Sequence, residues 1–300
     1  MLKAILFNII LSLTLASALK SAELDENSRW LLDRAQEANL IYKTPYKDEP
    51  WLKQERWING KFYTVNRNNH GLAHAVRKAF LIKNIVQEMR AAPAKTSLIA
   101  EWLQKKSPEE INKLIKKLEL AALYHRAGRE NENSRSSGTQ FEKDRFDRNM
   151  RSGALLFKDA AQKSGIFENE AEIEDYMQPY SRYELQQKRI PLTGDAKYID
   201  QILYTTHILD SKRVNADWND LTKKPSIKSD RLLKLADTLG YGYVNLPLIE
   251  KLDKLATRLL EVTGDRDKFQ ERTNYSDDFF IQAHDPELLV TTIRKVDAEQ

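Results

Sequence analysis

The chain has 300 residues, of which 41% are hydrophobic and 31% charged, and this composition is typical of a globular protein with a substantial core. Its net charge of +4 is too small to indicate a nucleic-acid partner, so we expect none. The sequence contains no cysteine, which excludes disulfides, thiolate nucleophiles and cysteine-ligated zinc.

The N-terminus differs from the rest of the chain. Lys3 precedes an apolar run from Ala4 to Leu19 that contains the small-residue pattern Ala16-Ser17-Ala18, as in a secretory signal peptide. The run is shorter than the roughly 20 residues that a membrane-spanning helix needs. We therefore interpret residues 1–22 as a signal peptide and expect an exported protein, with delivery to a host cell as one destination. An uncleaved segment is the alternative, and it is the only membrane contact that we expect.

Helical periodicity dominates the remainder, whereas strand-like alternation is scarce. The pattern predicts a first helix over 28–42. A long second helix is predicted to follow an N-cap at Asn68 or Asn69 and to run to about residue 89. Further helices are predicted over 109–127, 197–212, 230–239 and 248–262. Gly128 is predicted to end the helix that precedes it. Residues 62–65 are predicted as a short strand, and the Pro- and Trp-containing stretch 45–57 as irregular. With no repeat or linker, residues 23–300 are expected to form one all-α domain.

The segment 129–151 is rich in Arg, Glu, Asn and Ser, and its central part is too polar for a core. We interpret it as a surface segment. Contact with a protein substrate and simple solvation both remain open for it.

Three polar residues share one side of the helix predicted after Asn69. His70, His74 and Arg77 are spaced i, i+4, i+7, which places them within a sector of about 60°. Apolar residues cover most of the remaining circumference, as in a buried helix. Polar groups on such a helix need polar partners. A hydrogen-bonded core histidine is the alternative interpretation for any one of them.

Two further histidines lie near the ends of other predicted helices. His125 and Arg126 close one of them and are followed by Arg129, and guanidinium groups suit the recognition of phosphate. A helix C-terminus that merely favours basic residues is the alternative. His207 lies three residues before Asp210, and we predict that this carboxylate holds the His207 ring in one tautomer. His284 receives no role.

Residues 121–129, AALYHRAGR, resemble the hallmark of HD-domain phosphohydrolases, in which a His-Asp pair binds a divalent metal. Arg126 stands where the aspartate of that pair would be. A cation cannot ligate a cation, so we expect no metal there and no other cofactor. The guanidinium would instead supply positive charge to a phosphate.

A second resemblance covers nearly the whole chain after residue 22. Residues 68–77 (NNHGLAHAVR), 125–130 (HRAGRE) and 206–213 are similar, in order and spacing, to motifs of the phosphodiesterase domain of SidE-type bacterial effectors. The resemblance implies an all-helical domain that needs no metal, with a catalytic set formed by His70, Glu130 and His207. The candidate substrate contacts are Asn69, His74, Arg126, Arg129 and Arg213.

The same resemblance implies the reaction. The substrates would be ubiquitin modified with ADP-ribose or phosphoribose, and a host protein modified on serine. Because the chain has no room for a transferase domain, we expect hydrolysis of phosphoribosyl-serine linkages. His70 would act as nucleophile through a phosphohistidine, His207 as general acid and base, and Glu130 as the group that orients an imidazole.

Two alternatives stay open at this point. One is a divergent HD-type phosphodiesterase that acts on nucleotides or cyclic dinucleotides. The other is a catalytically inactive module that binds ubiquitin.

Overall fold

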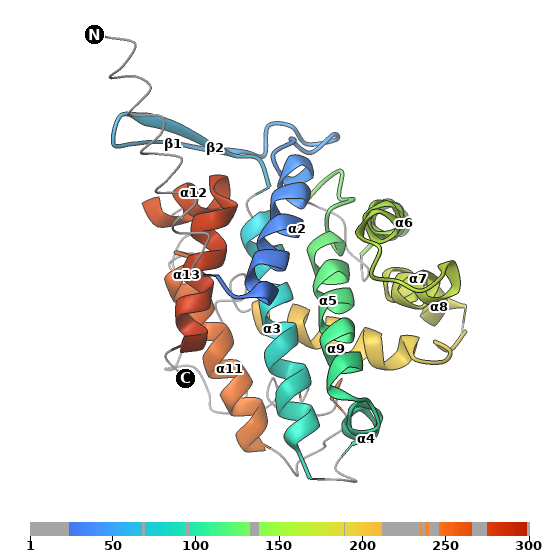
Figure 1. Cartoon of the computed structure of the whole chain (residues 1–300). Helices are drawn as coiled ribbons and strands as arrows, with labels where there is room; N and C mark the ends of the chain where they lie inside the picture. The colour runs from blue at the N-terminus through green and yellow to red at the C-terminus, as the bar shows by residue number, and fades with distance from the viewer. Residues whose placement is uncertain are drawn as a thin grey trace.

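The described part of the computed structural model consists of helices around one long buried helix, with a two-stranded hairpin at one end (Figure 1). The structure describes residues 24–67, 70–93, 97–132, 138–188, 190–211, 235, 238–239, 246–265 and 275–298. The predicted signal peptide, Asn69, Arg213 and most of the helix predicted over 230–239 lie outside these ranges. The predicted mostly helical fold class is confirmed.

The elements follow one another with short connections. In chain order they are α2 (Glu26–Tyr42), β1 (Gln54–Ile58), β2 (Lys61–Val65), α3 (Leu72–Ala91), α4 (Leu98–Gln104), α5 (Pro108–Tyr124), α6 (Gln140–Ser164), α7 (Glu170–Met177), the 3₁₀ turn η1 (Gln178–Ser181), α8 (Arg182–Gln187), α9 (Ala196–Asp210), α11 (Leu246–Val262), α12 (Asp277–His284) and α13 (Pro286–Ala298).

Helix α3 is the centre of the packing. It contacts α5 and α9 most extensively, and α2, α4, α11 and α13 also pack on it. Apolar side chains surround most of its circumference, and the polar His74, Arg77 and Lys78 are buried with them. The prediction that this helix is buried is confirmed. Its predicted start is wrong, because the helix begins at Leu72 with Gly71 as N-cap. His70 therefore lies in the turn before the helix and not on its polar stripe.

Helix α5 leads to His125. Ser107 and Glu110 form a capping box at its start, with Pro108 in the first turn. The helix ends at Tyr124, earlier than predicted, and His125 is its C-cap. Gly128 therefore does not end this helix, contrary to the prediction. A Cβ added to it would lie 2.0 Å from the backbone nitrogen of Gly153, so a glycine is required where the chain crosses α6.

Much of the polar segment predicted as a surface stretch is helical. The helix α6 starts at Gln140, where Thr139 and Glu142 form a second capping box. Phe146 and Met150 lie on its buried face. A solvated loop is therefore wrong from Gln140 onward: this part is a helix that packs through a narrow apolar stripe, while most of its other side chains lie at the surface.

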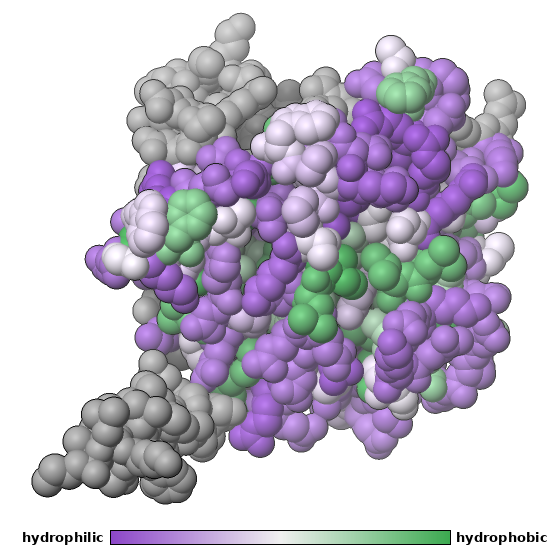
Figure 2. Space-filling model, turned by 90° about the horizontal axis from the view of Figure 1, so that it is seen from above, coloured by the Kyte–Doolittle hydropathy of each residue, from purple (hydrophilic) through white to green (hydrophobic). Residues whose placement is uncertain are grey.

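The strand predicted over 62–65 is confirmed as part of β2. It pairs antiparallel with β1, where the sequence predicted irregular structure. Asn59 and Gly60, with φ of 49° and 77°, form the two-residue turn that suits a tight hairpin. Trp57 and Phe62 pair across the strands and are exposed. Seen from above, the described surface is mainly hydrophilic with separate apolar patches (Figure 2). Within the described ranges, no helix is both long and apolar enough to cross a membrane.

Candidate active site

Four histidine rings form a row across the face of the helical core. The ring centroids of His70 and His74 are 5.5 Å apart, those of His74 and His207 6.2 Å, and those of His207 and His125 6.3 Å. The rings come from the turn before α3, from α3, from α9 and from the end of α5. Thus segments that are far apart in the sequence deliver the predicted histidines to one place.

The fifth histidine lies elsewhere. His284 packs edge-on against Tyr63 at a ring distance of 5.3 Å, and its Nδ1 is 2.9 Å from the carbonyl oxygen of Phe280. It serves the contact between α12 and the hairpin.

The His70 end of the row carries a carboxylate and a guanidinium. His70 Nδ1 lies 2.9 Å from Glu132 Oε1, and Arg129 Nη1 lies 3.5 Å from His70 Nε2. The His70 side chain is 14% exposed, so this end is within reach of a ligand. With its Nδ1–H donated to Glu132, His70 turns the Nε2 lone pair towards Arg129, whose Nη1 is the donor on that side.

Surrounding loops fix Glu132 from several sides. Tyr46 donates its hydroxyl to Glu132 Oε2 at 2.5 Å, and the backbone N–H of Glu132 donates to Glu49. Arg129 donates to the backbone carbonyl of Glu132 at 2.6 Å. Burial tends to raise the pKa of Glu132, but His70, Arg129 and Tyr46 outweigh it and hold this pKa well below its usual range. Glu132 is therefore ionised at neutral pH.

The imidazole contact that the sequence assigned to Glu130 is made by Glu132. The Glu130 carboxylate lies 3.7 Å from Lys47 Nζ, and its side chain is 38% exposed. Its backbone N–H donates to Asn149 Oδ1. Sequence reasoning missed Glu132 although it is only two residues away, because a loop has no periodicity that tells which side chain turns inwards. A catalytic role of Glu130 stays a prediction.

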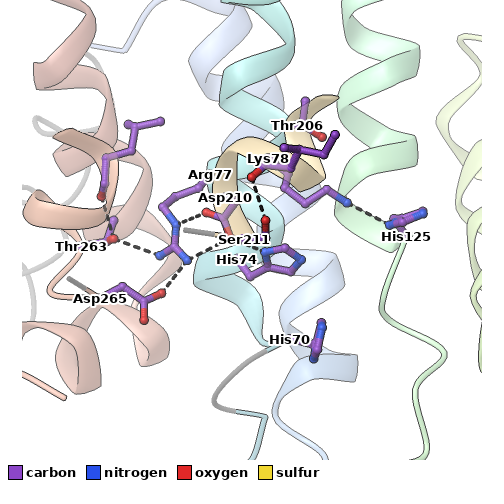
Figure 3. A network of polar contacts seen from close by, with 12 residues as sticks. His70, His74, Arg77, Lys78, His125, Thr206, Asp210, Ser211, Thr263 and Asp265 are labelled. Carbon is purple, nitrogen blue, oxygen red and sulfur yellow. Dashed lines mark hydrogen bonds and ion pairs between the residues drawn. The ribbon is translucent and has the colours of Figure 1, made fainter. Parts of the chain in front are cut away.

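His74 occupies the middle of the row and is bound by Asp210. His74 Nδ1 lies 2.5 Å from Asp210 Oδ2, and Arg77 Nε donates to Asp210 Oδ1 at 2.6 Å (Figure 3). All three side chains are buried. The sequence assigned Asp210 to His207 on the same helix, but at the end of α9 its carboxylate faces α3. His207 instead packs between His74, His125 and Tyr204.

The His125 end carries an ammonium group. Lys78 is fully buried, and its Nζ lies 2.9 Å from His125 Nδ1 (Figure 3). Burial, together with the charges of Lys78 and Arg126, lowers the pKa of His125 well below its usual value. His125 is therefore neutral, accepts at Nδ1 from Lys78 and carries its proton on Nε2. Sequence reasoning missed Lys78, although its i+4 spacing from His74 was a signal.

Arg126 also reaches the row. Its guanidinium lies 5.2 Å from the Phe146 ring, and Nη1 is 3.3 Å from Met150 Sδ. Together with His125 and His207 it lines a small cavity of about 20 Å³. Of the five predicted substrate contacts, His74, Arg126 and Arg129 thus lie at the row, whereas Asn69 and Arg213 lie outside the described residues.

A larger cavity of about 570 Å³ adjoins the small one, and Arg182 and Asp200 line both. Burial raises the pKa of Asp200 to about 6 against the opposing effect of Arg182, which lies 3.1 Å away. Leu185, Leu192 and other apolar side chains also line the larger cavity.

The side chains at the row differ from the donor set of a metal centre. Among the residues that the structure describes, no three His, Asp or Glu side chains are arranged to hold a metal ion. Where the HD-type pattern places a second ligand after the histidine, this chain has Arg126, and Lys78 contacts His125 itself.

The sequence and the fold of the chain are similar to those of known proteins. The model of the SidE phosphodiesterase (PDE) domain matches residues 45–269. The crystal structure of lpg1496 under 350 MPa is similar at a TM-score of 0.61 and 19% identity, covering 91% of this chain and 97% of that one. The structure of the C-terminal domain of lpg1496 from Legionella pneumophila is similar at a TM-score of 0.51 and 20% identity, covering 91% of this chain and 96% of that one. At these identities the two structures show a shared fold.

No curated protein matches the chain by sequence. The family model, however, covers three quarters of the chain, and the residues that form the row fall within its span. The protein therefore belongs to the SidE phosphodiesterase domain family and is a phosphodiesterase.

Proposed function

We propose that this phosphodiesterase cleaves phosphoribosyl or ADP-ribosyl linkages on ubiquitin, with hydrolysis of the phosphoribosyl-serine bond as its main reaction. The observation that supports this best is the row of four imidazoles, with His70 set between a carboxylate and a guanidinium. Such a site offers a nucleophile, a proton donor and positive charge, which are the three requirements of phosphodiester cleavage.

In the first step, His70 Nε2 attacks the phosphorus. A P–N bond forms and the P–O bond to the leaving group breaks, while His207 donates a proton to the leaving oxygen. Glu132 holds the Nδ1–H of His70 and stabilises the positive charge that develops on its ring. Arg129 is placed to neutralise the phosphoryl oxygens.

In the second step, His207 removes a proton from water, whose oxygen attacks the phosphorus. The P–N bond breaks and His70 is restored. Because one ring must be neutral and the other protonated, turnover should be bell-shaped with pH. The cavity beyond Arg182 and Asp200 offers space for the part of the substrate on the far side of the phosphate.

Three substrates and one chelator test this proposal. The protein is incubated with a serine peptide carrying phosphoribosyl-ubiquitin, with ADP-ribosyl-ubiquitin, and with a cyclic dinucleotide, each with and without EDTA. We expect release of phosphoribosyl-ubiquitin or of AMP from the ubiquitin substrates, unchanged by EDTA. Mass spectrometry of a rapidly quenched wild-type reaction should detect phosphate-linked substrate on His70, and the His70→Ala variant should show none.

Other outcomes would contradict it. Cleavage of the cyclic dinucleotide only, lost with EDTA and restored by manganese, would indicate an HD-type enzyme. Binding of ubiquitin without any product would indicate an inactive module.

A further inference from the structure

The larger cavity lies on the leaving-group side of the proposed reaction. When His70 attacks the phosphorus and His207 protonates the leaving oxygen, the leaving group extends from the phosphate towards His207. His207 lines the small cavity, which shares Arg182 and Asp200 with the larger one. On α9, Asp200, Tyr204 and His207 are spaced i, i+4, i+7 and therefore lie along one side of the helix. This stripe leads from the row to the larger cavity over about 10 Å.

Arg182 and Asp200, where the two cavities meet, have unused capacity for hydrogen bonds. Arg182 Nη1 lies 3.1 Å from Asp200 Oδ2, but the two groups are not aligned for a hydrogen bond, and this buried nitrogen has no hydrogen-bond partner among the described residues. The guanidinium lies 3.9 Å from the centroid of the Tyr204 ring, which fixes its plane. A buried N–H without an acceptor is costly. A peptide group could supply that acceptor to Arg182 and donate its own N–H to Asp200.

The wall of the larger cavity is mainly aliphatic. Leu98, Leu185, Ile190 and Leu192 are among the side chains that line it. Leu98 and Ile190 are 66% and 50% exposed. Exposed aliphatic side chains that line a hollow are typical of a binding site for an apolar group.

A nucleotide fits this cavity less well than a peptide. Nucleobases are commonly held by stacking on aromatic rings. The ring of Tyr198, which lines the cavity, already stacks on Trp102 at a centroid distance of 5.0 Å, and Lys197 Nζ lies 4.6 Å from it. Asp200, with a pKa of about 6, is ionised at neutral pH and offsets the attraction of Arg182 for the phosphate of a nucleotide.

We propose that the larger cavity is a specificity site for the substrate protein: it binds an aliphatic side chain about three residues from the modified serine, and Arg182 and Asp200 bond the peptide backbone between them. The spacing follows from the stripe on α9, since an extended chain rises about 3.3 Å per residue and the stripe is about 10 Å long. The position relative to the serine rests on the proposed function.

Serine peptides that differ in one residue test this inference. Each peptide carries phosphoribosyl-ubiquitin on its serine, and leucine or glutamine stands about two to four positions before or after it. We expect leucine at one of these positions to raise kcat/KM about tenfold over glutamine, because one aliphatic side chain leaves water. Equal kcat/KM for the leucine and glutamine peptides at every position would overturn the inference.

Variants of the cavity wall locate the effect. Ile190→Ser should abolish the preference for leucine and leave the protein folded, because this side chain is half exposed. Leu192→Ser should do the same. Leu40→Ser, at an exposed position of α2, is the matched control and should keep the preference. Arg182→Gln should lower kcat/KM for all the peptides but keep the preference, because it bonds the backbone. A preference that survives in both wall variants would contradict the inference.

Binding measured without cleavage separates this inference from the proposed function. Fluorescence anisotropy compares the leucine and glutamine peptides, with their serine unmodified, and fluorescent AMP. A leucine peptide that binds about tenfold tighter to the wild type but not to Ile190→Ser, in a protein that cleaves no ubiquitin substrate, would support the specificity site and contradict the proposed function. Cleavage of all the peptides at one rate would contradict the inference and leave the function intact. Binding of AMP that Ile190→Ser weakens, without any preference for leucine, would assign the cavity to a nucleotide and overturn the inference.

Discussion

The two ends of the histidine row show how a neighbour decides what an imidazole can do. At one end, the carboxylate of Glu132 accepts from His70 Nδ1, so the lone pair of this ring is on Nε2, on the side of Arg129. At the other end, the ammonium of Lys78 donates to His125 Nδ1, which leaves an N–H on Nε2. The same side chain thus presents a lone pair on Nε2 in one place and an N–H on Nε2 in the other.

The structural elements that hold the two ends of the row in place also differ. Loops that carry Tyr46, Glu49 and Arg129 fix Glu132 at the His70 end. Packed helices bring Lys78 and His125 together at the other end. Because loops tolerate displacement better than packed helices, the His70 end is the part of the site that can adjust to a substrate.

The largest expected effect concerns the nucleophile. His70→Ala should lower kcat at least about 1,000-fold, since neither step of the proposed reaction proceeds without it. The melting temperature should fall only moderately, because Glu132 loses its His70 contact but keeps those with Arg129 and Tyr46. His284→Ala, outside the row, is the control. Normal turnover by His70→Ala would mean that the nucleophile lies elsewhere.

The next largest effect on kcat distinguishes Glu132 from Glu130. Glu132→Gln should lower kcat about 100-fold, because the amide cannot stabilise the charge that develops on the His70 ring. Glu130→Gln is the matched control and should stay within about twofold of the wild type, since its carboxylate is half exposed beside Lys47. A larger loss of kcat in Glu130→Gln than in Glu132→Gln would indicate that Glu130 is the catalytic glutamate.

A smaller effect is expected at the other end of the row. Lys78→Met removes the ammonium next to His125, so the pKa of His125 should rise towards its usual value, although burial still lowers it. NMR titration of the His125 ring measures this change, and kcat should fall about tenfold. Lys83→Met, farther along the same helix, should alter neither. An unchanged His125 titration would show that burial outweighs the Lys78 charge.

The smallest effect is on stability. The pKa of Glu132 in the folded protein lies below its unfolded value of roughly 4.3. The ionised Glu132 therefore stabilises the folded protein above the unfolded pKa. This contribution is lost as the pH falls below that value, because the unfolded chain binds the proton more readily than the folded protein. Urea unfolding should show wild type more stable than Glu132→Gln by on the order of 2 kcal/mol at pH 7, with a smaller difference at pH 3. A difference independent of pH would exclude this linkage.

Much of the fold follows from local patterns. The all-round apolar residues of α3, the capping box of α5 and the leucine spacing of α11 each predict a helix, because a helix needs only its own periodicity and ends to be recognised. The helix α6 was missed because its few apolar positions are spread over a strongly polar sequence.

The sequence by itself determined the candidate residues for the chemistry: the histidines, the arginines at 126 and 129, and a glutamate in the segment that follows them. Only the tertiary structure decided the partners. Glu132 rather than Glu130 faces His70, Asp210 contacts His74 rather than His207, and Lys78 meets His125. The physical reason is that these contacts join loops and helices far apart in the chain, and their direction depends on how those elements pack rather than on spacing along the sequence.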